Sequence, residues 1–139
     1  MESPLKICVI TNNPLVVSGL PKQYLVDYAD ITYRQILVKV RDLVYAGYRL
    51  YTHPLSGSVK PNETPYKSVV VSRKPEKMEV AEAAIISASI ETFDKFRPGK
   101  RELTAQIQKD FQLVDYALLC GALGLDAAAG LSIIASQKL

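Results

Sequence analysis

The segment Leu5 to Thr11, L-K-I-C-V-I-T, is the feature that most limits how this chain can fold. It is almost continuously apolar and rich in β-branched residues. It stops at Asn12-Asn13-Pro14, where asparagine and proline supply turn chemistry. A strand that is apolar on both faces has to be covered on both sides, as strands of α/β proteins are. The segment therefore predicts a strand at the centre of a sheet with helices on its faces.

Later segments predict the rest of the sheet. Between two of the expected strands, apolar residues recur at helical spacing from Asp30, a candidate N-cap, to Gly47, a residue suited to end a helix. A strand, a helix, a glycine turn and a strand form a βαβ unit, in which the two strands are parallel. The next connection has no helix, so the strand after it is expected to be antiparallel to the one before it. The three expected strands are Tyr24–Tyr28, Tyr48–Thr52 and Lys67–Ser72.

The C-terminal part reads as helical throughout. A helix over 76–96 would carry an apolar stripe, and so would a second helix over 102–123, with Pro98-Gly99 between them. Asp126 can cap a final short helix over 127–136. These helices would cover a face of the sheet or form a contact between two copies of the chain, and the sequence leaves both open. The predicted stripes are Met78, Ala81, Ile85, Ala88 and Phe93, then Leu103, Ile107, Phe111, Val114 and Leu118.

We therefore expect one α/β domain over residues 1–139. Its sheet would be small and mainly parallel, with about four strands, the fourth of them antiparallel, and helices would cover it. Composition favours an ordinary globular protein, because 48% of the residues are hydrophobic and the net charge is only +3. Basic residues are scattered among acidic ones, so a nucleic-acid partner is not expected. The lack of a long apolar run or leader predicts a cytoplasmic protein with no membrane partner.

The connection from Thr52 to Ser68 is the best candidate for a functional site. A connection of about fifteen residues without a helix is uncommon in a compact domain and is usually functional or disordered. This one holds the single histidine and three of the eight prolines. If the first and third strands are parallel, the connection starts at the same sheet edge where the first strand ends, at Asn12 and Asn13. The candidate ligand-binding residues are Asn12, Asn13, Ser56, Gly57, Ser58, Lys60, Asn62, Thr64, Tyr66 and Lys67.

Two kinds of chemistry fit this connection. His53 could act as a general acid/base assisted by Glu63, or it could be a structural residue at a strand end. Ser56-Gly57-Ser58 followed by Lys60 could form a cradle for an anion, or only a tight turn. One histidine and one carboxylate do not make a metal-ligand set, and no motif indicates a cofactor.

Three stretches resemble the GrdX family, small proteins encoded beside the glycine reductase genes of amino-acid-fermenting anaerobic bacteria. They are T-N-N-P-L-V from Thr11, R-D-L-V from Arg41, and G-Y-R-L-Y-T-H-P-L-S-G-S-V-K-P-N-E-T-P-Y-K-S from Gly47. The resemblance covers roughly residues 5 to 120. The family pattern leads us to expect histidines where this chain has Tyr45 and Tyr48.

The resemblance implies no established activity. It implies a cytoplasmic accessory role in reductive, Stickland-type amino-acid metabolism. We therefore expect a non-catalytic accessory protein that binds a small anionic metabolite or a protein of the reductase system at the 52–68 edge. A small enzyme that uses His53 is the alternative.

Overall fold

The computed structural model describes residues 3–55, 60–61, 63–97 and 102–128. Its sheet has three strands in the order β2-β1-β3. β1 (Ile7–Thr11) lies in the middle, β2 (Leu25–Tyr28) pairs with it in parallel, and β3 (Ser68–Ser72) pairs with it antiparallel. The continuous apolar run at the N-terminus thus forms the central strand, as predicted.

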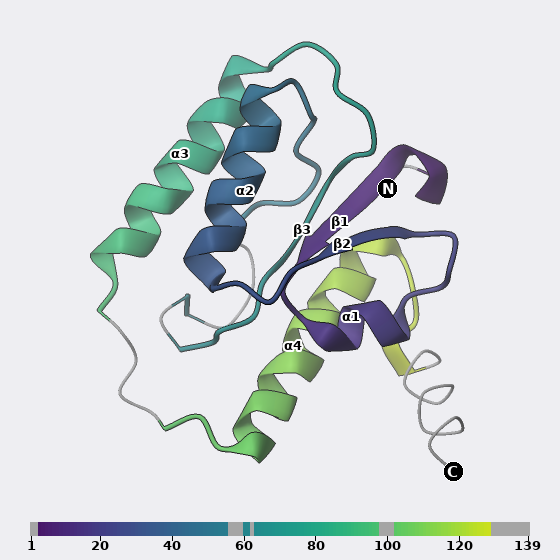
Figure 1. Cartoon of the computed structure of the whole chain (residues 1–139), viewed down its shortest axis with the longest axis vertical. Coiled ribbons are helices and arrows are strands. Elements are labelled where there is room, and N and C mark those ends of the chain that lie inside the picture. The colour runs from purple at the N-terminus through teal and green to yellow at the C-terminus, as the bar shows by residue number, and fades with distance from the viewer. Residues whose placement is uncertain (1–2, 56–59, 62, 98–101, 129–139) are drawn as a thin grey trace.

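Helices cover both faces of this sheet (Figure 1). After a short 3-10 turn, η1 (Pro4–Lys6), α1 (Pro14–Gly19) follows β1 directly and α2 (Tyr33–Tyr45) follows β2. α3 (Val80–Lys95) packs along α2, whereas α4 (Ala105–Leu123) packs with α1 on the opposite face. The result is a layered α/β fold with an all-helical C-terminal part.

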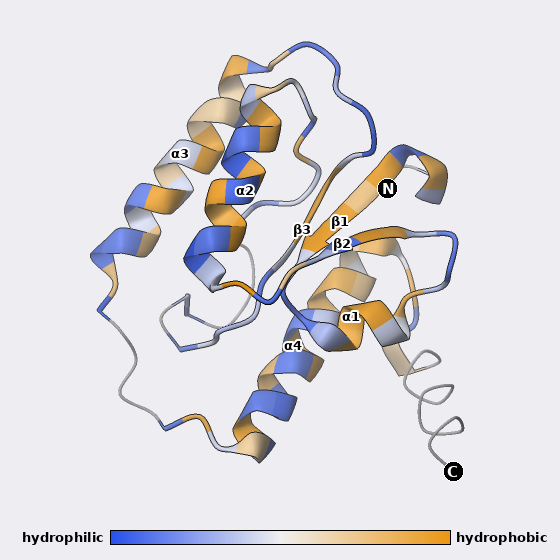
Figure 2. Cartoon of the chain, viewed as in Figure 1, coloured by the Kyte–Doolittle hydropathy of each residue, from blue (hydrophilic) through white to orange (hydrophobic). Residues whose placement is uncertain are grey.

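The alternation of side chains along β1 and β3 divides the core into two halves. Cys8 and Ile10 of β1 pack with α2 and α3, whereas Ile7 and Val9 pack with α1 and α4. The residues of β3 divide in the same way, and β1 is hydrophobic along its length in Figure 2. Because both faces are buried, the sequence of β1 needs no polar alternation.

The predicted four-stranded, mainly parallel arrangement is not confirmed. The segment Tyr48–Thr52, expected as a strand, makes only an isolated antiparallel bridge from Leu50 to Val71 of β3. Side chains replace the rest of the expected ladder: Val70 N–H donates to Thr52 Oγ1 and Arg49 N–H donates to Ser72 Oγ, both at 2.9 Å. On the side away from β3, Leu50 N–H donates to Glu82 Oε1 at 2.6 Å. Within the described residues the sheet therefore ends at β3, and its central strand has one parallel and one antiparallel neighbour.

The start of α2 also differs from the prediction. Thr32, not Asp30, is the N-cap, and it forms a capping box with Gln35. The Thr32 hydroxyl accepts from Gln35 N–H at 3.1 Å, and Gln35 Oε1 accepts from Thr32 N–H at 2.8 Å. Asp30 lies two residues before this N-cap and is exposed.

The apolar stripes predicted for the last two helices are wrong for most of their residues. In α3 the buried residues are Ala83, Ile86, Ser89 and Ile90, and in α4 they are Asp115, Tyr116, Leu119, Cys120 and Leu123. Both helices have apolar residues on more than one side, so periodicity alone could not choose the buried face. The predicted short helix over 127–136 lies mostly outside the described residues. Among the predicted stripe residues, the exposed ones include Met78, Ile85, Leu103, Val114 and Leu118.

In the part of the chain that the structure describes, no helix combines the length and the apolar character needed to cross a membrane.

The turn after α2 gives the first prediction. Gly47 has φ +107°, and a Cβ added there would collide with the carbonyl oxygen of Glu76. Gly47→Ala should lower the free energy of unfolding by about 2 kcal/mol or more, measured by urea denaturation. The matched control is Gly121→Ala in α4, where an added Cβ meets nothing within 4 Å. It should be neutral or stabilise by up to about 1 kcal/mol. Equal effects of the two changes would contradict this account.

Candidate functional site

Asn12, at the end of β1, connects three segments that are distant in the sequence. Its Nδ2 donates to the carbonyl oxygens of Ile31 at 2.9 Å and Pro65 at 2.7 Å. Its Oδ1 accepts from Lys67 N–H at 2.9 Å. The residues before β3 therefore lie next to Asn12 at the end of β1.

Asn13 belongs to a buried network centred on Asp115 of α4. Asp115 Oδ2 accepts from Asn13 Nδ2 at 3.0 Å and from Ser68 Oγ at 2.7 Å, and its Oδ1 accepts from Ser68 N–H at 3.1 Å. Because the Ser68 hydroxyl donates to Asp115, it must accept from Thr11 Oγ1, which lies 2.7 Å away. Thr11 Oγ1 in turn accepts from Asn13 N–H at 2.9 Å. The network joins β1, β3 and α4 and positions the start of α1, where Leu15 N–H donates to Asn13 Oδ1.

Burial dominates the electrostatics of this network. It raises the pKa of Asp115, and the hydrogen bonds from Asn13 and Ser68 and the charge of Lys67 only partly oppose this. Lys67 is itself 7% exposed, and burial lowers its pKa. Burial, and next the charge of Asp115, also raises the pKa of Tyr33. The polar groups of this network form hydrogen bonds with one another, and these bonds stabilise the fold.

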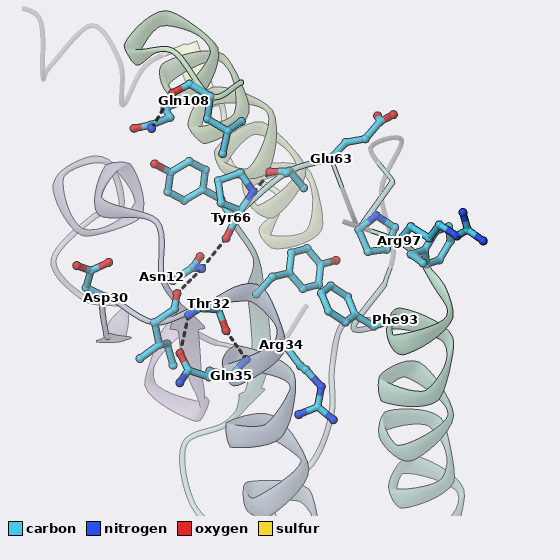
Figure 3. A pocket seen from close by; sticks show the side chains of 17 residues that line it. Asn12, Asp30, Thr32, Arg34, Gln35, Glu63, Tyr66, Phe93, Arg97 and Gln108 are labelled. Atoms are coloured by element: carbon cyan, nitrogen blue, oxygen red, sulfur yellow. Dashed lines mark hydrogen bonds between the residues drawn. The ribbon is translucent and has the colours of Figure 1, made fainter. Parts of the chain in front are cut away.

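A cavity of about 1050 Å³ opens beside this network (Figure 3). Four parts of the chain line it: residues 30–35 at the start of α2, the described residues of 61–66, the end of α3, and residues at or before the first turns of α4. Asn12 contributes to its lining as well, so the tightly bonded amide that fixes the sheet edge also forms part of the cavity. Aromatic rings come from Tyr33, Tyr66, Phe93 and Phe96.

The ionisable side chains that line the cavity are balanced in number but differ in their partners. Arg34 makes two hydrogen bonds to Asp94, at 2.8 and 3.0 Å, and this pairing lowers the pKa of Asp94. Asp30 and Glu63 have no side-chain hydrogen bond or ion pair to any other described residue. In the view of Figure 3, Asp30 lies at the left of the cavity, and Glu63 and Arg97 lie at the right.

The residues predicted for the site fall into four groups. Asn12, Glu63, Thr64 and Tyr66 line the cavity. Asn13 and Lys67 are buried beside it. His53 and Lys60 are exposed and do not line it, and His53 Nδ1 accepts from Leu55 N–H at 3.1 Å. The remaining predicted residues, Ser56, Gly57, Ser58 and Asn62, lie outside the described residues.

The sequence analysis did not identify several residues of the cavity or of the network beside it. Tyr33 and Phe93 stack with their ring centroids 5.1 Å apart, which joins the start of α2 to the end of α3.

Asp115 is the one charged residue in the stretch Leu113–Leu123, and a lone carboxylate in an apolar stretch could have been recognised as a buried, hydrogen-bonded group. Among the described residues, no group of three or more His, Cys, Asp or Glu could hold a metal ion.

Comparison with known proteins identifies a family. The family model described as GrdX-like protein matches residues 8–124 of this 139-residue chain. The chain belongs to the GrdX-like family. Membership suggests an association with glycine reductase systems and names no activity. No curated protein and no solved structure matches the chain.

The buried network gives the second prediction. Asp115→Ala removes one of the two acceptors of Asn13 Nδ2, the other being Gln112 O, and the acceptor of both donors of Ser68. The free energy of unfolding should fall by about 3 kcal/mol or more, because buried donors without an acceptor cost about 1–3 kcal/mol each. Asp110→Ala is the control in the same helix, since Asp110 is exposed and, within the described part of the chain, accepts only from Gln106. It should change stability by less than about 0.5 kcal/mol. A similar loss in both variants would refute the structural role of the network.

The pKa of Asp115 gives a pH prediction. Since folding raises this pKa above the ordinary value of 3.8, the folded state binds the proton more tightly than the unfolded chain does. The contribution of Asp115 to stability is thus largest below the unfolded pKa and falls as the pH rises through the folded pKa. The unfolding free energy of the wild type minus that of Asp115→Asn should therefore decrease over this interval, measured by urea denaturation at several pH values. A difference that stays flat or increases would show that the sign is wrong.

Proposed function

We propose that this chain is a non-catalytic accessory protein of a glycine reductase system and that it binds a small anionic metabolite in the cavity beside residues 61–66. The observation that carries the proposal is the cavity itself. Its volume of about 1050 Å³ lies just above the range typical of small-molecule sites, which ends at about 1000 Å³. Membership of the GrdX-like family supports the setting.

The mixture of groups around the cavity supports binding of a metabolite. Arg97 and Arg34 can attract a carboxylate or phosphate, the amide of Gln108 can donate a hydrogen bond, and aromatic rings offer apolar contact. Asn12 fixes this part of the molecule through three hydrogen bonds to the backbone. A site that is rigid before binding loses less entropy when a ligand enters.

An enzyme that uses His53 has less support. Neither His53 nor Lys60 is among the residues that line the cavity. A general acid/base has to come within hydrogen-bond reach of its substrate. A protein of the reductase system remains the alternative ligand, and it would be favoured if no small molecule binds.

A thermal-shift panel of carboxylates, acyl phosphates and nucleotides tests the proposal. A ligand that binds only the folded state at one hundred times its Kd adds about 2.7 kcal/mol to the free energy of unfolding, which raises the melting temperature. We expect at least one anion to do so in the wild type and to lose most of its effect in Arg97→Gln. The control is Arg41→Gln, because Arg41 is paired with Asp42 and does not line the cavity. If no anion shifts the wild type, or if Arg97→Gln responds like the control, the cavity is not the anion site that we propose.

A further inference from the structure

The carboxylates of the cavity point to a feature of the ligand that an anion alone would not explain. Asp30 and Glu63 line the same cavity as Arg34 and Arg97, so a purely anionic ligand would have to approach two negative charges as well as two positive ones. Arg34 already has a carboxylate partner in Asp94, whereas neither Asp30 nor Glu63 has a side-chain partner among the described residues. The carboxylates of Asp30 and Glu63 can therefore attract a cation.

The aromatic residues strengthen the case for a positive group. Tyr33, Tyr66, Phe93 and Phe96 all line the cavity. The face of an aromatic ring attracts an ammonium group, by about 0.5–1 kcal/mol at exposed sites and more where water is excluded. Rings combined with carboxylates suit an ammonium group better than either does alone.

The size of the cavity indicates that the ligand has an apolar body in addition to its charged groups. A volume of about 1050 Å³ is far more than an ammonium and a carboxylate need by themselves. Apolar side chains such as those of Ile31 and Leu103 also line the cavity, and the rings can pack against an apolar ligand body. In Figure 3 Asp30 lies on a different side of the cavity from Glu63 and Arg97, so charges of both signs surround the space.

We propose that the ligand of this cavity is a zwitterion of the amino-acid class with an apolar body. Its ammonium group binds the carboxylate of Glu63 beside the aromatic rings, and its carboxylate binds Arg97; Asp30 adds negative charge on the other side of the cavity. This inference rests on the proposed function, because it specifies the metabolite that the same cavity would take. It adds a positive group that the proposed function does not require.

Three compounds that share one apolar body test the inference: L-phenylalanine, 3-phenylpropanoate, which lacks the ammonium, and 2-phenylethylamine, which lacks the carboxylate. Binding to the full chain is measured by isothermal titration calorimetry at pH 7 and low salt. L-Phenylalanine should bind at least about tenfold more tightly than either analogue, because only it satisfies both sets of charges. In the double variant Asp30→Asn/Glu63→Gln, the affinity for L-phenylalanine should fall to that for 3-phenylpropanoate, whose own affinity should not fall. Asp42→Asn, which changes an exposed carboxylate outside the cavity, is the control and should leave all three affinities unchanged.

The outcomes separate this inference from the proposed function. If 3-phenylpropanoate binds as tightly as L-phenylalanine, the zwitterion inference is overturned while anion binding stands. If 2-phenylethylamine binds as tightly as L-phenylalanine, both the zwitterion and the anionic preference are overturned. If no compound of the series binds, the inference is overturned, and the anion panel then decides separately whether the proposed function survives.

Discussion

The carboxylate of Asp115 is the constraint on which the arrangement of this protein depends. It lies on α4, yet its three hydrogen-bond donors belong to Asn13 and Ser68, near the ends of the paired strands β1 and β3. A buried carboxylate is expensive unless donors surround it, so α4 has one favourable position and depth against the sheet. That position also brings Leu103 and Gln108 to the cavity that the start of α2 lines as well. The geometry of the cavity is thus set by a polar interaction outside it.

The sequence predicted the parts of the fold that depend on local pattern. The continuous apolar run that ends at Asn12-Asn13-Pro14 forms the central strand β1. The residues at helical spacing before Gly47 form α2. The failures came where tertiary contacts override the pattern. The Tyr48–Thr52 segment has the composition of a strand, but the hydroxyls of Ser72 and Thr52 accept from the N–H groups of Arg49 and Val70, so the ladder stops at one bridge. Pairings between residues so far apart in the sequence leave no trace in local periodicity.

The last two helices, α3 and α4, also show that local pattern does not determine tertiary packing. The C-terminal half of α4 is apolar nearly all around, and the sequence stripe through Val114 and Leu118 was as regular as the stripe that is buried. Asp115 decides between them, because its side chain can be buried only where Asn13 and Ser68 supply donors. A charge within an apolar stretch therefore carried more information about the packing than the apolar residues did. The same holds for the candidate site: the Asn12 and 61–66 part could be predicted, but Tyr33, Phe93 and Arg97 could not, since they come from helix ends that meet only in three dimensions.

The hydrogen bonding of Asn12 constrains how the cavity can recognise a ligand. Both donors of its amide and its acceptor are already occupied by backbone groups, so it can shape the cavity but has only limited capacity left to bind what enters. Recognition then falls to groups whose bonding is incomplete, and among the described residues of the lining these include the carboxylates of Asp30 and Glu63. Asn12, which is held rigidly close to the sheet, thus determines the shape of the cavity, whereas Asp30 and Glu63 determine which charge it attracts. A ligand that satisfied only the arginines would leave those carboxylates facing it, and this is the physical reason why the charge of the ligand, more than its size, should determine what binds here.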